Sequence, residues 1–208
     1  MEIEYFGANA VIIKSGNAVI TVDPKLNSLG VKNLPVKDTI ELVTHRRFAV
    51  DDNQKILIDG PGEYEISNVS IKGIAAQQHI DEDGTRATIY RVIVGGYRIA
   101  IMGHIDPKLD EDQLESIGVV DIVIIPIGGG GYTLDAHAAA SIVKHIDPKV
   151  VIPTHYYDKG LKYEVPQQEL EAFTKELGSV THETTAKYKL KAGSSLADTL
   201  TLVHLTRA

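Results

Sequence analysis

Two nearly continuous apolar runs constrain the fold of this chain more than any other feature. Residues 121–127 read Asp-Ile-Val-Ile-Ile-Pro-Ile, and residues 150–155 read Val-Val-Ile-Pro-Thr-His. A strand with one face in water alternates apolar and polar residues, so unbroken runs indicate strands that are buried on both faces. Between the two runs, apolar residues recur at four-residue spacing over 134–146, which predicts a helix. We therefore expect a sheet that is covered on both sides.

Turn signals divide the rest of the chain into short strands. Ser15-Gly16-Asn17, Ser67-Asn68 and Gly95-Gly96 each separate two apolar or alternating runs, which is the pattern of a β-hairpin. Helices are expected over 110–117 and 166–177 from the residues at their ends. The remaining apolar segments predict strands at residues 3–6, 10–14, 18–22, 39–44, 55–58, 63–66, 69–75, 87–94, 97–102, 187–191 and 199–205. We expect one α/β domain over residues 1–208, with two sheets packed face to face and helices outside.

The composition argues against several classes of function. Hydrophobic residues make up 43% of the 208 residues and charged residues 24%, an ordinary globular balance that allows a sizeable core. The net charge of −7 is unsuited to a phosphate backbone, so we expect no nucleic-acid partner. No apolar run approaches the ~20 residues of a membrane helix, and acids stand near the N-terminus where a signal peptide carries basic residues. We expect a cytoplasmic protein without a membrane partner; a homo-oligomer is compatible with the sequence.

Histidines are the natural candidate metal ligands, because the chain contains no cysteine. Four of the eight histidines stand at the ends of expected strands, where functional side chains are often placed on a rigid scaffold. They are His45, His79, His104 and His155. Strand ends that converge would make a metal site, whereas separate strand ends would leave polar or capping histidines. The spacing alone does not decide between the two.

A run of four glycines, residues 128–131, follows the first apolar run and precedes the predicted helix. A glycine loop at a helix N-terminus can bind an anion, but this spacing matches neither a dinucleotide fingerprint nor a phosphate-binding loop. A tight turn is the simpler interpretation. Asp135, at the helix start, is expected to cap the helix or, alternatively, to point into a site at the same edge.

Several segments resemble one family in order and in sequence. Residues 58–65 read Ile-Asp-Gly-Pro-Gly-Glu-Tyr-Glu, residues 125–129 read Ile-Pro-Ile-Gly-Gly, and residues 151–156 read Val-Ile-Pro-Thr-His-Tyr. They are similar to zinc-dependent hydrolases of the metallo-β-lactamase fold, in the small single-domain branch related to the ascorbate-6-phosphate lactonase type. The resemblance covers nearly the whole chain. It implies a four-layer αββα sandwich with two metal ions at one edge and hydrolysis by a metal-bound hydroxide.

The main ligand motif of that family is degraded in this chain. The family carries His-x-His-x-Asp-His after a strand, and this chain keeps only His45, with Arg47, Ala49 and Val50 at the other ligand positions. Alanine and valine cannot ligate a metal, and a guanidinium repels a dication. The standard dinuclear site therefore cannot form.

The remaining ligand positions of the family fall on histidines. The resemblance places one ligand at His79 and another at His155. It puts His104 at the position of the aspartate that bridges the two metals in the family. Three histidines and a water make a workable catalytic site for one zinc ion, so this replacement keeps a metal site open.

Two hypotheses follow from this pattern. In the first, the chain is an inactive homologue, or pseudoenzyme, that acts by binding a small molecule, and Arg46 and Arg47 contact an anion. In the second, it is a hydrolase of a small ester, lactone or phosphoester that uses one divalent metal, either Zn, Mn or Fe. The four strand-end histidines would then supply the ligands, and Asp135 or an aspartate near residue 51 would act as the general base or support a ligand. The sequence leaves open whether the chain is an enzyme.

Overall fold

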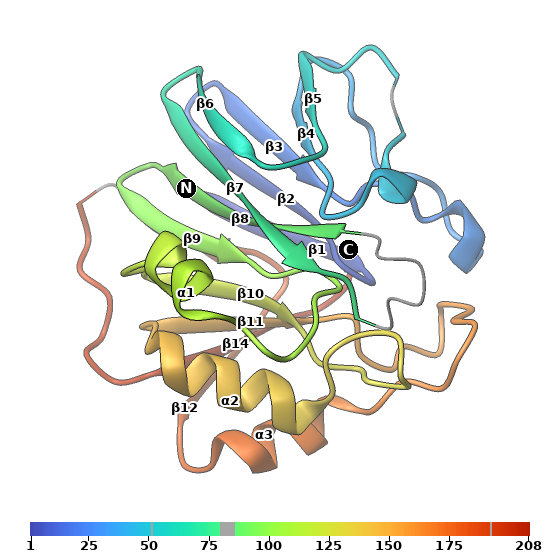
Figure 1. Ribbon diagram of the computed structural model, residues 1–208, viewed down its shortest axis with the longest axis vertical. Helices are drawn as coiled ribbons and strands as arrows, with labels where there is room; N and C mark the ends of the chain where they lie inside the picture. Colours follow the sequence, from blue (N-terminus) through green and yellow to red (C-terminus); the bar gives the residue numbers. More distant parts are fainter. Residues whose placement is uncertain (51, 80–85, 192) are drawn as a thin grey trace.

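The structure is a computed structural model that describes residues 1–50, 52–79, 86–191 and 193–208 (Figure 1). Its helices are α1 (Glu111–Ile117), α2 (Ala136–Ile146) and α3 (Leu170–Leu177), and two 3-10 turns are η1 (Asn27–Leu29) and η2 (Arg46–Phe48). The strands are β1 (Glu2–Gly7), β2 (Ala10–Ser15), β3 (Ala18–Val22), β4 (Ile40–Leu42), β5 (Ile56–Ile58), β6 (Gly62–Ile66), β7 (Val69–Gln77), β8 (Arg86–Val94), β9 (Tyr97–Ile101), β10 (Ile122–Pro126), β11 (Val150–Thr154), β12 (Thr181–Thr185), β13 (Tyr188–Lys189) and β14 (Thr201–Leu205).

The strands form two sheets. The six-stranded sheet has the order β13-β1-β2-β3-β4-β5, and the eight-stranded sheet has the order β12-β14-β11-β10-β9-β8-β7-β6. Antiparallel pairing of β2 with β3, β6 with β7 and β8 with β9 confirms the three predicted hairpins. Gly95 and Gly96 in the last of these turns have φ values of 61° and 84°, which residues with a side chain rarely adopt.

The two apolar runs form the centre of the eight-stranded sheet. β10 pairs in parallel with β9 on one side and with β11 on the other, and every residue of β10 and β11 is buried. On the outer side of this sheet α2 packs against β10, and α3 packs beside α2 (Figure 1). The inner side faces the six-stranded sheet. The strands are thus covered on both faces, as the sequence pattern predicts.

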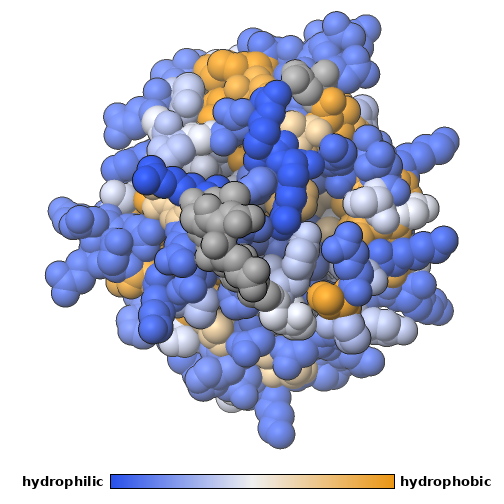
Figure 2. All heavy atoms as spheres, turned by 45° about the vertical axis from the view of Figure 1, so that its right-hand side comes forward, coloured by the Kyte–Doolittle hydropathy of each residue, from blue (hydrophilic) through white to orange (hydrophobic). Residues whose placement is uncertain are grey.

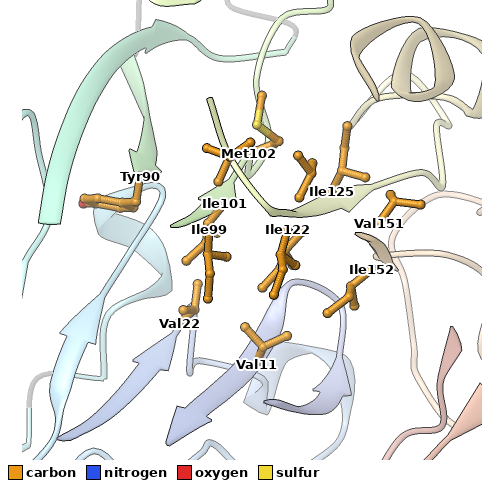
Figure 3. Close-up of a cluster of buried hydrophobic side chains, with 14 of the residues drawn as sticks. Val11, Val22, Tyr90, Ile99, Ile101, Met102, Ile122, Ile125, Val151 and Ile152 are labelled. Carbon is orange, nitrogen blue, oxygen red and sulfur yellow. The ribbon is translucent and has the colours of Figure 1, made fainter. Parts of the chain in front are cut away.

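A continuous hydrophobic core fills the space between the sheets. Side chains from both sheets meet there, among them Val11, Val22, Ile99, Ile122 and Ile152 (Figure 3). Tyr90, on β8, is fully buried, and its hydroxyl donates to the backbone carbonyls of Val43 and Ile58 at 3.0 Å each. This side chain ties the eight-stranded sheet to the ends of β4 and β5 in the other sheet.

The outer face of the six-stranded sheet is covered differently. Leu26 and Leu34, from the loop that contains η1, pack on Ala10 and Ile12 of β2. The outer layer on this side is therefore a loop with a 3-10 turn, whereas α1, α2 and α3 accompany the eight-stranded sheet. The two packed sheets with outer layers confirm the predicted sandwich fold, although a loop replaces the helical layer beside the six-stranded sheet.

One predicted helix begins later than expected. The pattern predicts a start at Pro166, whereas α3 begins at Leu170. The residues between them bond elsewhere: the Gln167 side chain contacts His155, and the backbone N–H of Gln168 donates to the carbonyl of Gly128. Tertiary contacts here override the local preference for helix.

One face of the molecule is mainly polar. Hydrophilic residues cover most of the face shown in Figure 2, and hydrophobic residues appear on it in separate patches. Within the described part of the chain, no helix combines the length and apolar character that crossing a membrane requires.

Candidate functional site

Strand ends bring the candidate residues to one edge of the sandwich. Parallel strands end at the same edge of a sheet, and β9, β10 and β11 are parallel. His104 follows β9, the glycine run follows β10, and His155 follows β11. In the other sheet, β3 and β4 are also parallel, and they end next to Asp23 and Thr44.

His104 and His155 form the centre of this edge. Their ring centroids are 4.7 Å apart, and the rings meet edge to face at 86°. Both residues are almost fully buried, with 2% and 3% of their surface exposed. Burial lowers the pKa of His155 to about 4 and the pKa of His104 well below its usual value. Both imidazoles are therefore neutral at pH 7.

A hydrogen-bonded neighbour orients each of the two rings. Nδ1 of His104 lies 3.0 Å from Nδ2 of Asn9, and Nδ1 of His155 lies 3.0 Å from Oε1 of Gln167. The opposite nitrogen of His104, Nε2, is buried and makes no hydrogen bond to the residues that the structure describes. A buried polar atom without a partner points to a ligand or a water at this position.

The loop between β1 and β2 joins the two sheets at the site. His155, which has a positive φ of 48°, donates its backbone N–H to the carbonyl of Ala8 at 2.7 Å. The hydroxyl of Thr154 donates to Oδ1 of Asn9 at 3.2 Å. These contacts hold Asn9 against the ends of β9 and β11, although Asn9 belongs to the other sheet.

Asp23 completes the buried polar group. Its carboxylate accepts the backbone N–H and the hydroxyl of Thr44, each at 2.7 Å. Burial raises the pKa of Asp23 to about 7, although the hydrogen bonds from Thr44 and Asn9 act in the opposite direction. The carboxyl group is therefore an unusually weak acid. Asn9 links it to the site, because Asn9 also contacts His104.

Arg47 and Phe48 cover the histidine pair. The Phe48 ring stacks on the His104 ring, with centroids 5.0 Å apart and planes at 27°. The Arg47 guanidinium lies over the rings of Phe48 and Tyr132, at 4.7 and 5.0 Å from their centroids. Its charge lowers the pKa of both buried histidines, although burial has the larger effect.

A cavity of about 70 Å³ opens beside these residues. Asn9, Asp23, His104 and His155 supply its polar lining. The aromatic rings of Phe48, Tyr132 and Tyr163, the aliphatic Leu26, Leu29 and Val165, and the charged Lys25 and Glu164 also line it. The cavity combines apolar walls with a few convergent polar groups, which is typical of small-molecule sites.

The other predicted site residues lie outside this cavity. His45 caps η2, and its Nδ1 accepts the backbone N–H of Arg47 at 3.1 Å. His79 meets His104 through the backbone, with its N–H donating to the His104 carbonyl at 3.0 Å. Arg46 forms a salt bridge with Asp59 at 2.8 Å.

Asp135 serves as the helix cap that the sequence suggests as one of its two roles. Its carboxylate accepts the backbone N–H of Ala138 at 2.8 Å at the start of α2, and its side chain is exposed. It does not line the cavity. The structure thus brings two of the four strand-end histidines together at the cavity and places Asp135 elsewhere.

Three of the residues that hold the site are not found from the sequence alone. Asn9, Asp23 and Gln167 orient the histidines or each other, yet none belongs to a recognised motif. Asp23 carries a usable signal, because it directly follows an apolar strand, as the candidate histidines do. Asn9 and Gln167 carry none, since both act through contacts between distant segments.

The donor groups at this edge do not fit the two metal ions that the resemblance implies. Within the residues that the structure describes, no three histidine, aspartate or glutamate side chains form a group that could hold a metal ion. Phe48 packs against both His45 and His104, with centroids 6.2 and 5.0 Å from its own. An apolar ring thus occupies space next to two of the expected ligands.

Comparison with known proteins places the chain in a family. Residues 2–155 match the β-lactamase superfamily domain. A metal-dependent hydrolase from Pyrobaculum islandicum is 28% identical over 192 residues, which cover 75% of this chain and 84% of the relative. Another from Lysinibacillus sphaericus is 24% identical over 196 residues, covering 75% of this chain and 85% of the relative.

Solved structures share the fold. A Thermotoga maritima protein, assigned to the zinc-dependent hydrolases of the metallo-β-lactamase superfamily, has a TM-score of 0.73 at 23% identity and 99% coverage of both chains. Igni18, a metallo hydrolase from Ignicoccus hospitalis, has a TM-score of 0.60 at 18% identity, with 85% of this chain and 89% of that chain covered. The domain match and the shared architecture show that this chain belongs to the β-lactamase superfamily.

Proposed function

We propose that this chain binds a small anionic molecule in the cavity beside His104 and His155, and that it does so without the two metal ions of its family. The position of Arg47 carries this proposal. Its guanidinium lies over Phe48 and Tyr132, and both of these rings line the cavity. A permanent positive charge therefore stands at the place where metal-dependent relatives need room for cations.

Arg47 has the surroundings of an anion-binding residue. Among the described residues its guanidinium contacts aromatic rings and forms no salt bridge, and its side chain is exposed. The adjacent Arg46 differs, because it is paired with Asp59. Of the two arginines that the sequence suggests as anion ligands, Arg46 is paired with a carboxylate and Arg47 is available to bind an anion.

The size of the cavity limits the ligand. A volume of about 70 Å³ with aromatic walls suits a short molecule whose anionic group lies at Arg47 and whose remaining atoms lie against the histidines. Lys25 adds a second positive charge to the lining, and Glu164 adds a negative one. A short monoanion fits this balance better than a multiply charged phosphate.

Calorimetric titration of chelator-treated protein with short carboxylates tests the proposal. We expect glycolate or lactate to bind, and we expect Arg47→Met to weaken binding at least tenfold. Arg46→Met is the matched control, because the neighbouring arginine is already paired with Asp59, and it should leave the affinity within about twofold. Absence of binding by every acid, or equal losses in the two variants, would overturn the proposal.

A second candidate is a hydrolase that uses one metal ion. Nε2 of His104 lacks a hydrogen-bond partner within the described residues, and relatives from Pyrobaculum islandicum and Lysinibacillus sphaericus are metal-dependent hydrolases. His104 and His155 would hold such an ion. Metal analysis of protein purified without chelator distinguishes the candidates: one equivalent of Zn, Mn or Fe that is lost in His155→Ala would favour the hydrolase over the metal-free binding protein.

A further inference from the structure

We propose that Asn9 fixes the tautomer of His104, so that the two histidines offer the cavity one hydrogen-bond donor and one acceptor and select ligands that carry a hydroxyl group beside the acid. The choice of ligand rests on the proposed function. The tautomer itself does not, because it follows from the hydrogen bonds of the protein alone.

The orientation of the Asn9 amide is determined by three neighbours. Its Oδ1 accepts the hydroxyl of Thr154 at 3.2 Å, and its Nδ2 lies 3.0 Å from Nδ1 of His104. The side chain of Asn9 also lowers the pKa of the Asp23 carboxyl group, which is the effect of a donor beside a carboxylate. The Asn9 amide nitrogen is thus placed as a donor and its oxygen as an acceptor. When Asp23 is ionised, above its pKa of about 7, the reversed amide would place its oxygen against a carboxylate, which is unfavourable.

This orientation determines the proton position on His104. Because Nδ1 accepts a hydrogen bond from Asn9, the single proton of the neutral ring must be on Nε2. Nε2–H is therefore a buried donor that has no partner among the described residues. A protonated nitrogen has no free lone pair, so His104 in this form is a donor to a ligand and not a ligand to a metal.

His155 carries its proton on the other nitrogen. The Gln167 amide is oriented by its own contact, in which Nε2 donates to the carbonyl of Val165 at 3.0 Å. Its Oε1 therefore faces His155 and must accept from Nδ1–H at 3.0 Å. This leaves Nε2 of His155 with a lone pair. Two neighbouring imidazoles thus present opposite hydrogen-bonding character.

A hydroxyl group matches this pair better than other small polar groups. Its oxygen accepts one hydrogen bond and donates another, so a single hydroxyl can accept from His104 and donate to His155. The two rings meet edge to face with centroids 4.7 Å apart and both line the cavity, so we place the ligand hydroxyl between them. With the carboxylate at Arg47, the ligand class is a short hydroxy acid, and a plain carboxylate such as acetate lacks the second anchor.

Nitrogen-15 NMR of the histidine rings tests the tautomers in the intact protein without any ligand. Long-range correlations, assigned with His104→Ala and His155→Ala, distinguish the two neutral forms. We expect His104 with its proton on Nε2 and His155 with its proton on Nδ1. In Asn9→Asp, whose carboxylate can only accept, the His104 proton should move to Nδ1. Gln167→Glu is the matched control, because it keeps an acceptor beside His155 and should change neither ring.

Titration with glycolate and acetate tests the selection. We expect glycolate to bind at least tenfold more tightly than acetate, and Asn9→Asp to remove the difference. Equal binding of the two acids with loss in Arg47→Met would overturn the selection and leave the proposed function standing. No binding of either acid would overturn both, whereas a wild-type His104 with its proton on Nδ1 would overturn the tautomer assignment irrespective of any ligand.

Discussion

Two buried acids of the six-stranded sheet show opposite behaviour. Glu4, on β1, lies 2.8 Å from Lys14 and 2.8 Å from Lys187, and these hydrogen-bonded ion pairs lower its pKa to about 2. Asp23, at the end of β3, forms no salt bridge with the described residues, and burial raises its pKa to about 7. The same chemical group stabilises the fold on β1 and costs stability after β3.

The difference separates a structural from a functional use of a buried carboxylate. Glu4 is matched by positive charges, so its ionised form is favoured. Asp23 accepts two hydrogen bonds from Thr44, Asn9 lowers its pKa, and Asn9 in turn contacts His104. A buried carboxyl group with a strongly raised pKa is typical of functional sites. Three variants test this contrast.

The largest effect is expected from Gly103→Ala. Gly103 has a φ of 63°, and a Cβ atom there would lie 2.5 Å from Cβ of Thr44, the residue that holds Asp23. Left-handed backbone and overpacking together should cost about 3–4 kcal/mol in urea unfolding. Gly96→Ala, with φ 84° and no atom within 4 Å of the added Cβ, is the control and should cost about 1–2 kcal/mol. Similar losses in both variants would show that the contact with Thr44 is unimportant.

Asp23→Asn should change the pH dependence of stability. The folded pKa of about 7 lies above the ordinary value of 3.8, so wild-type Asp23 destabilises the fold progressively as pH rises from about 4 to 7. The free energy of unfolding of Asp23→Asn, relative to the wild type, should therefore increase over this range by on the order of 3 kcal/mol. Denaturation at pH 4, 6 and 8 measures it, with the exposed Asp38→Asn as control. A flat difference would contradict the raised pKa.

Glu4→Gln should have the smallest effect, with the opposite sign. The folded pKa of about 2 lies below the ordinary 4.5, so the stabilisation by Glu4 is present above about pH 4.5 and is lost as pH falls towards 2. We expect a loss of about 1–2 kcal/mol at pH 7 that shrinks on acidification. Glu2→Gln, whose lysine partners are more distant at 3.3 and 3.6 Å, should lose less. A loss that stays constant with pH would argue for packing instead of charge.

Local patterns predict most of the fold, because its elements are determined by neighbours in sequence. The central strands follow from uninterrupted apolar runs, and the hairpins follow from glycine and asparagine turns. Local patterns do not predict β12, because its sequence Thr-His-Glu-Thr-Thr is polar and almost entirely exposed. Its pairing with β14 depends on a neighbour that lies sixteen or more residues away, which no local pattern encodes.

The sequence predicts the candidate site less completely than it predicts the fold. His104 and His155 can be selected as strand-end residues, but nothing in their spacing shows that they meet while His45 and His79 hold other partners. The decisive neighbours are Asn9 and Gln167, which reach the histidines from distant segments. Their contributions depend on how two sheets pack, and packing is a property of the whole chain.

The order of strands also affects how this chain can fold as it is synthesised. β14 lies between β11 and β12 in the eight-stranded sheet, although it follows both in the chain. β12 cannot join the sheet until residues 201–205 have been made and have paired with β11. Residues 181–185 are therefore synthesised before the strand with which they pair. Completion of this edge therefore waits for β14, and until β14 pairs with it, β11 is an open edge that a chaperone or a second chain can contact.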